Sequence, residues 1–195
     1  MDAPTLTRLI RDGSLDAELA ALLWTLAVAG VPVHVVAPTP EAAEPLASAV
    51  RAVAPEPAGV TVSTGDAIER ALALPVPLRP ATGAVVIVRE GIVVAAHLLR
   101  PPLRDAGGHV RPQGPAVLAT AREDGGWEHF AWGITPELAG LSGQHAGDFE
   151  IDQDRRREYL AGLAEAGIVE PESVVAALGG YAFDAGRAAG GSRRA

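Results

Sequence analysis

The sequence contains no cysteine and no lysine, and few of its residues are aromatic. Without cysteine, the chain cannot form a disulfide, a thiolate metal site or a cysteine nucleophile. All 16 basic residues are arginine, which excludes Schiff-base chemistry and any phosphate-binding loop that depends on lysine. Aromatic residues make up 4% of the chain, and the net charge is −8. We therefore expect no nucleic-acid partner, because nucleic acid is bound by basic grooves and stacking rings.

The length and composition indicate one globular domain. The chain has 195 residues, of which 48% are hydrophobic and 21% are charged, so a wholly disordered chain is not expected. Its N-terminus lacks a basic stretch followed by an apolar one, as a signal peptide has. The longest apolar run nearby, 19–28, is shorter than the roughly 20 residues that cross a bilayer. We therefore expect a soluble, cytoplasmic protein without membrane insertion.

Hydrophobic spacing in the first part of the chain predicts helices followed by a strand–turn–helix unit. Apolar residues recur at helical intervals from Leu15 to Leu26, and Gly30 and Pro32 end that helix. The run 31–37 is short, apolar and β-branched, as a buried parallel strand is. Prolines break this strand, and an amphipathic helix is expected next. The further elements expected are this helix at 41–53, a strand at 60–63, a helix at 67–74 and an extended connector at 75–80.

The second half of the chain predicts hairpins and then helices. Two alternating apolar segments with turn residues between them are typical of hairpins, at 84–99 and 116–132. Trp127 and His129 are expected on one face of the last strand, with Phe130 and Trp132 on the other. The other elements expected are a loop at 100–115, a helical turn capped by Thr135, a loop at 142–150, a helix starting at Asp152 or Asp154, and a last helix from Glu170.

These elements predict an α/β fold with a reduced P-loop-like βα core, an antiparallel β-hairpin region and C-terminal helices. The parts belong to one compact domain. They are 1–80 for the N-terminal helices and the βα core, 81–134 for the hairpins, 135–185 for the C-terminal helices and 186–195 for a disordered, glycine-rich tail.

Positions 37–44 have the spacing of a phosphate-binding loop but not its residues. Such a loop reads G-x-x-x-x-G-K-[ST]; its glycines let backbone N–H groups surround the phosphates, and its lysine reaches the β/γ oxygens. Here the window reads A-P-T-P-E-A-A-E, in which two prolines remove donors and two glutamates oppose phosphate. An ordinary βα turn is the alternative interpretation. The candidate residues of a degenerate nucleotide site are Ala37, Thr39, Ala42, Ala43 and Glu44.

The stretch 9–55 resembles the core of the type II and type IV secretion and pilus-motor ATPases, in which a helix precedes the strand and the phosphate-binding loop. Segment 60–72 looks like the strand-to-helix segment around that family's histidine box, and 84–132 looks like its closing antiparallel strands. The stretch with the acidic Walker B residue is missing. Glu90 follows a β-branched strand, but its Arg–Glu–Gly context favours a hairpin turn. The matching residues are Gly13, Leu15, Glu18, Leu19, Leu22, Leu23, Trp24 and Pro32.

The resemblance implies a non-catalytic relative of these motors, a pseudo-ATPase-like binding or regulatory module. No catalytic residue, cofactor or metal is predicted. The implied partner is a protein, either an active ATPase paralogue or a secretion or pilus component. The alternative is a nucleotide- or anion-binding protein or enzyme that uses the loop 100–111, with Arg100, Arg104 and Arg111 on the phosphates. A solubilising loop is the plainer interpretation of those arginines.

Other chemistry finds little support in the residue spacing. The five histidines form no close metal-binding pattern, and His34 and His97 lie in apolar strands. The acidic run 148–154 lacks the central glycine and terminal glutamate of a calcium loop. There is no G-x-S-x-G motif, which excludes the common hydrolase elbow.

Overall fold

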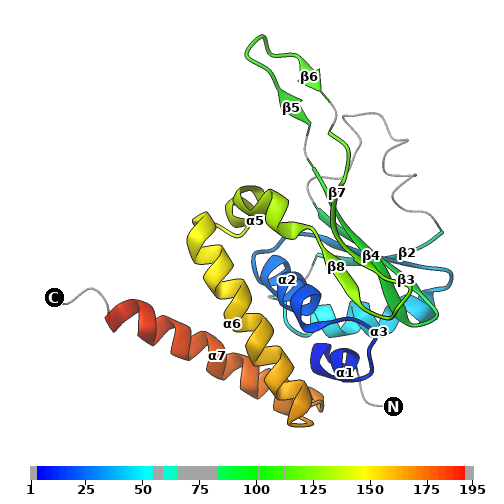
Figure 1. Ribbon diagram of the computed structural model, residues 1–195, viewed down its shortest axis with the longest axis vertical. Coiled ribbons are helices and arrows are strands. Elements are labelled where there is room, and N and C mark those ends of the chain that lie inside the picture. The colour runs from blue at the N-terminus through cyan, green and yellow to red at the C-terminus, as the bar shows by residue number, and fades with distance from the viewer. Residues whose placement is uncertain (1–3, 55–58, 66–82, 101, 112, 192–195) are drawn as a thin grey trace.

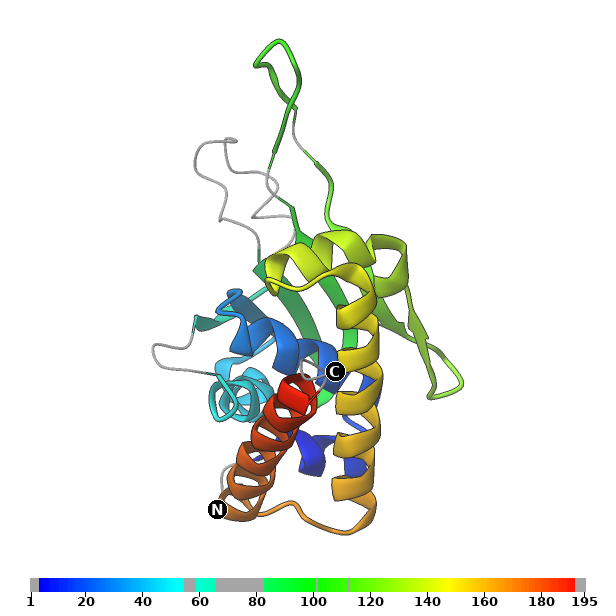
Figure 2. The same cartoon turned by 90° about the vertical axis from the view of Figure 1, so that its left-hand side faces the viewer.

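The computed structural model describes the whole chain except residues 1–3, 55–58, 66–82, 101, 112 and 192–195. It contains a six-stranded mixed sheet with its helices gathered on one side (Figures 1 and 2). The predicted α/β fold class is therefore confirmed. Within the described residues, no helix combines the length and apolar character needed to cross a membrane.

The sheet is parallel in one half and antiparallel in the other. Its strand order is β2-β1-β3-β4-β7-β8. Strand β1 (Val33–Ala37) pairs in parallel with β2 (Val60–Thr64) on one side and β3 (Gly83–Arg89) on the other. From β3 onward the neighbours β4 (Ile92–Leu99), β7 (Ala116–Ala121) and β8 (Trp127–His129) are antiparallel. The hairpin region thus continues the sheet that the βα core begins.

Two N-terminal helices pack beside this sheet. The first, α1 (Leu6–Arg11), is capped by the Thr5 hydroxyl, and α2 (Ala17–Val28) is capped by Asp16, which accepts from Leu19 N at 2.9 Å. Helix α2 is apolar on nearly all sides, so it lies in the interior. Its predicted apolar face and Trp24, which is 4% exposed, are all buried in one core with Val33 and Val35 of β1.

The hairpin predictions are confirmed, with changes at the ends. Glu90 and Gly91 form the tight turn between β3 and β4, with φ angles of 52° and 79°. These left-handed values are those of a type I′ turn. Strand β8 ends at His129, not at 132, because residues 131–134 form a short 3₁₀ helix, η2 (Ala131–Ile134). The expected loop at 100–115 instead contains two paired strands, β5 (Leu103–Arg104) and β6 (Val110–Arg111), which project from the body as an arm (Figure 1).

Among the C-terminal helices, α6 begins earlier and α7 extends further than the sequence predicted. Helix α5 (Thr135–Leu141) follows η2, with Ile134 rather than Thr135 at the cap position. Helix α6 (Ala146–Glu165) starts within the expected loop. Phe149 in its first turn is only 4% exposed, and its packing in the core holds that turn against the rest of the protein. Helix α7 (Pro171–Gly191) begins where predicted, but its helical backbone includes most of the tail expected to be disordered. The expected helix at 67–74 and connector at 75–80 lie outside the described residues.

Candidate functional site

The predicted loop after β1 is short. Strand β1 ends at Ala37 and α3 (Pro40–Arg51) begins three residues later, so only Pro38 and Thr39 connect them. Thr39 is the cap of α3, and its hydroxyl accepts from Ala42 N at 3.4 Å. Residues 40–44 of the eight-residue window are therefore helical. A phosphate-binding loop needs several non-helical residues whose N–H groups converge on one centre, and this connection does not supply them.

The side chains of positions 37–44 serve packing and ion pairing rather than ligand binding. Ala37 is 3% exposed and Ala43 is fully buried, both in the main core. Ala43 occupies the position of the phosphate-binding lysine, so that position faces the protein interior. Glu44 is exposed and forms an ion pair with Arg51, with 2.6 Å between Oε1 and Nη1.

A small cavity lies at the carboxyl ends of the parallel strands, where ligands commonly bind to open α/β sheets. Its volume is about 270 Å³, and its walls come from residues 36–38, Gly65 and residues 87–89. Arg89 is the one charged residue among these lining residues. The cavity is therefore largely apolar, whereas a nucleotide site would require several hydrogen-bond donors to the phosphates.

The three arginines predicted as an anion site are not brought together. Arg100 is engaged with Glu137 of α5, with 3.2 Å between Nε and Oε2. Arg104 pairs across the arm with Val110, and Leu103 pairs with Arg111. Because directly opposed residues share a face and successive residues alternate, Arg104 and Arg111 lie on opposite faces of the arm. Arg111 also lies 3.7 Å from Asp105.

A second cavity, the His129 cavity, lies where the start of α2, the end of β8, η2 and α6 meet. Its volume is about 320 Å³. Apolar, aromatic and acidic side chains share its wall. The lining residues are Glu18, Leu22, His129, Ala131, Trp132, Thr135, Phe149, Glu150, Gln153 and Asp154.

His129 joins β8 to the start of α2. Its Nε2 lies 2.6 Å from Asp16 Oδ2, and its Nδ1 lies 3.7 Å from Glu18 Oε1. Burial by itself lowers the pKa of His129, but its hydrogen bond to the Asp16 carboxylate and the charges of Asp16 and Glu18 together raise that pKa above its usual value. Both ring nitrogens face carboxylates, so His129 is placed as a cationic connector rather than as a free general base.

Trp132 is held at the cavity by its polar edge. The indole Nε1–H donates to the backbone oxygen of His129 at 2.6 Å, and the hydroxyl of Thr135 donates to the backbone oxygen of Trp132. The side chain is nevertheless 71% exposed. The ring is thus fixed in orientation while most of its surface remains open to contact.

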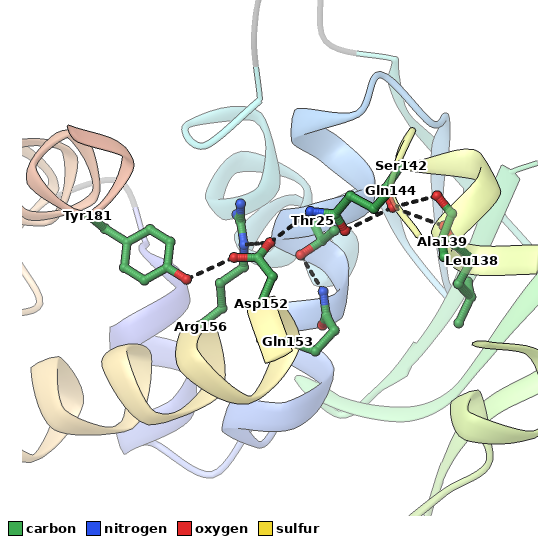
Figure 3. Close-up of polar contacts among 9 residues, drawn as sticks. All are labelled: Thr25, Leu138, Ala139, Ser142, Gln144, Asp152, Gln153, Arg156 and Tyr181. Atoms are coloured by element: carbon green, nitrogen blue, oxygen red, sulfur yellow. Dashed lines mark hydrogen bonds and ion pairs between the residues drawn. The ribbon is translucent and has the colours of Figure 1, made fainter. Parts of the chain in front are cut away.

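The cavity wall from α6 is set by a polar network on the neighbouring turns of that helix (Figure 3). Asp152 accepts from Arg156 Nε at 2.8 Å and from the Tyr181 hydroxyl at 2.9 Å. The Arg156 guanidinium lies 4.3 Å from the centre of the Trp24 ring. This network ties α6 to α2 and α7.

Gln153 adds a direct bond to α2 on the cavity side. Its side-chain Nε2 donates to the hydroxyl of Thr25, a buried residue of α2. Together with the Asp152 network, this bond fixes the rotation of α6. Glu150, Gln153 and Asp154 consequently line the cavity.

Sequence reasoning did not identify the His129 cavity. The contact between His129 and Asp16 joins residues 113 positions apart, and no local sequence pattern indicates it. His34 and His97 lie in strands as expected, and burial lowers the pKa of both. Among the described residues, no group of three or more histidine and acidic side chains could hold a metal ion.

No protein-family model matches the chain, and no curated protein matches it significantly. The relationship to secretion and pilus-motor ATPases therefore stays a prediction. The features of the molecule that bear on function are the β1–α3 connection and the His129 cavity.

Proposed function

We propose that this protein is a non-catalytic binding or regulatory module on a P-loop-like βα core, related to the secretion and pilus-motor ATPases but without nucleotide turnover. The observation that supports this proposal is the two-residue connection between β1 and α3. It leaves a parallel strand, a short turn and a helix in the order of a P-loop unit, while the phosphate-binding segment itself is helical.

The residues at this connection oppose a triphosphate in three separate ways. Pro38 and Pro40 have no N–H to donate. Ala43 is buried where a lysine would reach the phosphates, and the chain contains no lysine to reach in from elsewhere. Glu41 and Glu44 add negative charge at the start of the helix. A nucleotide at this edge would thus lack donors and meet repulsion.

The resemblance in sequence also suggests the kind of partner. A pseudo-ATPase that keeps the scaffold of a motor family is suited to bind an active ATPase paralogue, or a secretion or pilus component. Under this proposal, the protein acts through surfaces and cavities that remain when the nucleotide site is gone. The His129 cavity is the larger of the two cavities described above.

The test is titration of the full chain with magnesium ATP by calorimetry, together with an ATPase assay. We expect neither binding heat nor turnover. Thr39→Ala tests the role of Thr39 as the cap of α3. We expect it to lower the free energy of unfolding by about 1 kcal/mol and to change neither nucleotide binding nor turnover. Reproducible turnover by the wild-type protein that disappears on substitution within 37–44 would refute the proposal.

The same titration, extended to GTP and cyclic dinucleotides, tests the alternative anion site. Heat that vanishes in Arg100→Ala and Arg104→Ala would favour a site on the 100–111 segment. The opposed faces of Arg104 and Arg111 and the Arg100–Glu137 ion pair weigh against that outcome.

A further inference from the structure

We propose that the His129 cavity binds an alkylguanidinium group, either of a free guanidine compound or of an arginine side chain presented by another protein. The inference rests on the binding role proposed above. It does not depend on the absence of nucleotide turnover, and the two are tested with different ligands. The proposal is based on the charge, the aromatic surface and the size of the cavity.

The cavity carries more negative charge than its own cations balance. Glu18, Glu150 and Asp154 line it, whereas no arginine does among the residues that the structure describes. His129 is the single cationic side chain in the lining, and it already lies between Asp16 and Glu18. Asp154 is 3.2 Å from Arg157 Nη2. Glu150 has no ion pair within the described part of the chain, so its carboxylate is available to a cationic ligand.

The aromatic surface is the second observation, and it is independent of these charges. The Trp132 ring is fixed by the bond from its Nε1–H to His129 O, yet 71% of the side chain is exposed. Tryptophan gives the strongest cation–π contact of the side chains. Guanidinium is planar and weakly hydrated, so it can stack on an indole while donating to a carboxylate. An alkylammonium ion has no flat face that could stack on the ring.

The chain already holds one guanidinium with the same chemistry. Arg156 lies over the Trp24 ring at 4.3 Å and near the Tyr181 ring at 5.4 Å. Its Nε donates to Asp152 (Figure 3). In that network, the ring, the carboxylate and the guanidinium are all internal. The His129 cavity presents a ring and carboxylates without an internal guanidinium.

The size and the remaining wall fit an alkyl chain behind the guanidinium. A volume of about 320 Å³ lies at the small end of ligand-binding cavities, which span roughly 300–1,000 Å³. Leu22 and Phe149 are buried apolar residues of the lining, and they can contact methylene groups. The side-chain amide of Gln153 is already committed to Thr25, so the acidic side chains are left to receive the ligand.

The test measures binding of n-butylguanidinium to the full chain by calorimetry at low salt, with n-butylurea as a neutral ligand of nearly the same shape. We expect n-butylguanidinium to bind and n-butylurea to bind at least tenfold more weakly. Trp132→Leu should weaken guanidinium binding by about 2- to 30-fold, the range expected for a lost cation–π contact. Glu150→Gln should weaken it by about 2- to 5-fold, as expected for one partly screened charge.

Two control variants match these substitutions outside the cavity. Phe130→Leu removes another exposed ring beside η2, and Glu158→Gln removes another exposed charge from α6. Neither residue lines the cavity, and both variants should bind as the wild type does. Thermal unfolding checks that each variant is folded. Should Trp132→Leu fail to fold, Glu150→Gln, an exposed change, still decides the question.

A blocked Gly-Arg-Gly peptide distinguishes the two sources of the ligand. Binding of the peptide at least as tight as that of n-butylguanidinium assigns the group to an arginine of a protein partner. Binding of the small compound alone assigns it to a free guanidine; either outcome supports the proposal. No binding of n-butylguanidinium, equal binding of n-butylurea, or affinity unchanged by both cavity variants would overturn it.

Discussion

Removing the charge of Asp16 should destabilise the protein by an amount that depends on pH. Asp16 has two roles on two oxygens: Oδ1 caps α2 by accepting from Leu19 N, and Oδ2 lies 2.6 Å from His129 Nε2. Asparagine caps helices about as well as aspartate. Asp16→Asn therefore keeps the first role and loses the charged partner of His129.

The magnitude follows from the exposure of the two side chains. A hydrogen bond between charged groups contributes about 1.5–3 kcal/mol. The His129 side chain is 11% exposed and that of Asp16 is 32% exposed, so partial screening places the expected loss at the lower end, about 1.5–2 kcal/mol. For a chain of this length, that loss lowers Tm by about 3–8 °C. Asp16→Ala also removes the cap and should lose about 1 kcal/mol more.

The pH dependence has a definite sign. The pKa of His129 is raised in the folded protein, so the folded state holds its proton more tightly than the unfolded state does. The stability from this interaction is fully present below the unfolded pKa of about 6.5 and is lost as pH rises through the higher folded pKa. The deficit of Asp16→Asn should thus be larger at pH 6 than at pH 9. The pKa values of His34 and His97 are lowered in the folded protein, so these two residues make stability rise with pH instead. Their contribution cancels when the variant and the wild type are compared at the same pH.

Urea unfolding of a double-mutant cycle measures the coupling. The cycle uses Asp16→Asn, His129→Gln and the double variant at pH 6 and pH 9. Asp124→Asn is the matched control, because Asp124 also accepts a backbone N–H and pairs with an arginine, but at an exposed turn. It should change stability by less than about 0.5 kcal/mol. A coupling energy near zero at pH 6, or one that is equal at both pH values, would refute the reasoning.

Further predictions concern single residues. Glu90→Asn should raise the free energy of unfolding by about 0.5–1 kcal/mol in urea titrations, because asparagine tolerates the φ of 52° better than glutamate does; an unchanged or lower value would contradict the turn assignment. Burial, the hydrogen bond to Asp152 and the charge of Asp152 raise the pKa of Tyr181 to about 12, so ultraviolet titration should show a phenol ionising near that pH, and Tyr181→Phe should remove it. That step persisting in Tyr181→Phe would assign it to another residue.

Several features of the fold were predictable because they depend on neighbours in the sequence. The apolar interval from Leu15 to Leu26 predicts α2, and the β-branched run before Pro38 predicts β1. The Arg–Glu–Gly turn predicts the β3–β4 hairpin, since its left-handed positions are set within two residues. The absence of lysine excludes a working phosphate-binding loop of the usual kind in any fold that the chain could adopt, because that loop needs a lysine side chain.

Other features depended on contacts that no local pattern carries. The polar residues at 142–150 suggested a loop, but the burial of Phe149 against the core extends α6 back to Ala146. The three arginines of 100–115 suggested a cluster, but strand pairing in the arm places Arg104 and Arg111 on opposite faces.

The His129 cavity shows most clearly where sequence reasoning ends. By itself, the sequence placed Asp16 at the start of a helix and His129 within a strand, because helical spacing and strand alternation act over a few residues. Only the tertiary structure decided that these two side chains meet across 113 positions and form a cavity with α6. That meeting depends on the order of strands in the sheet and on the rotation of α6, which are set by the packing of the whole core.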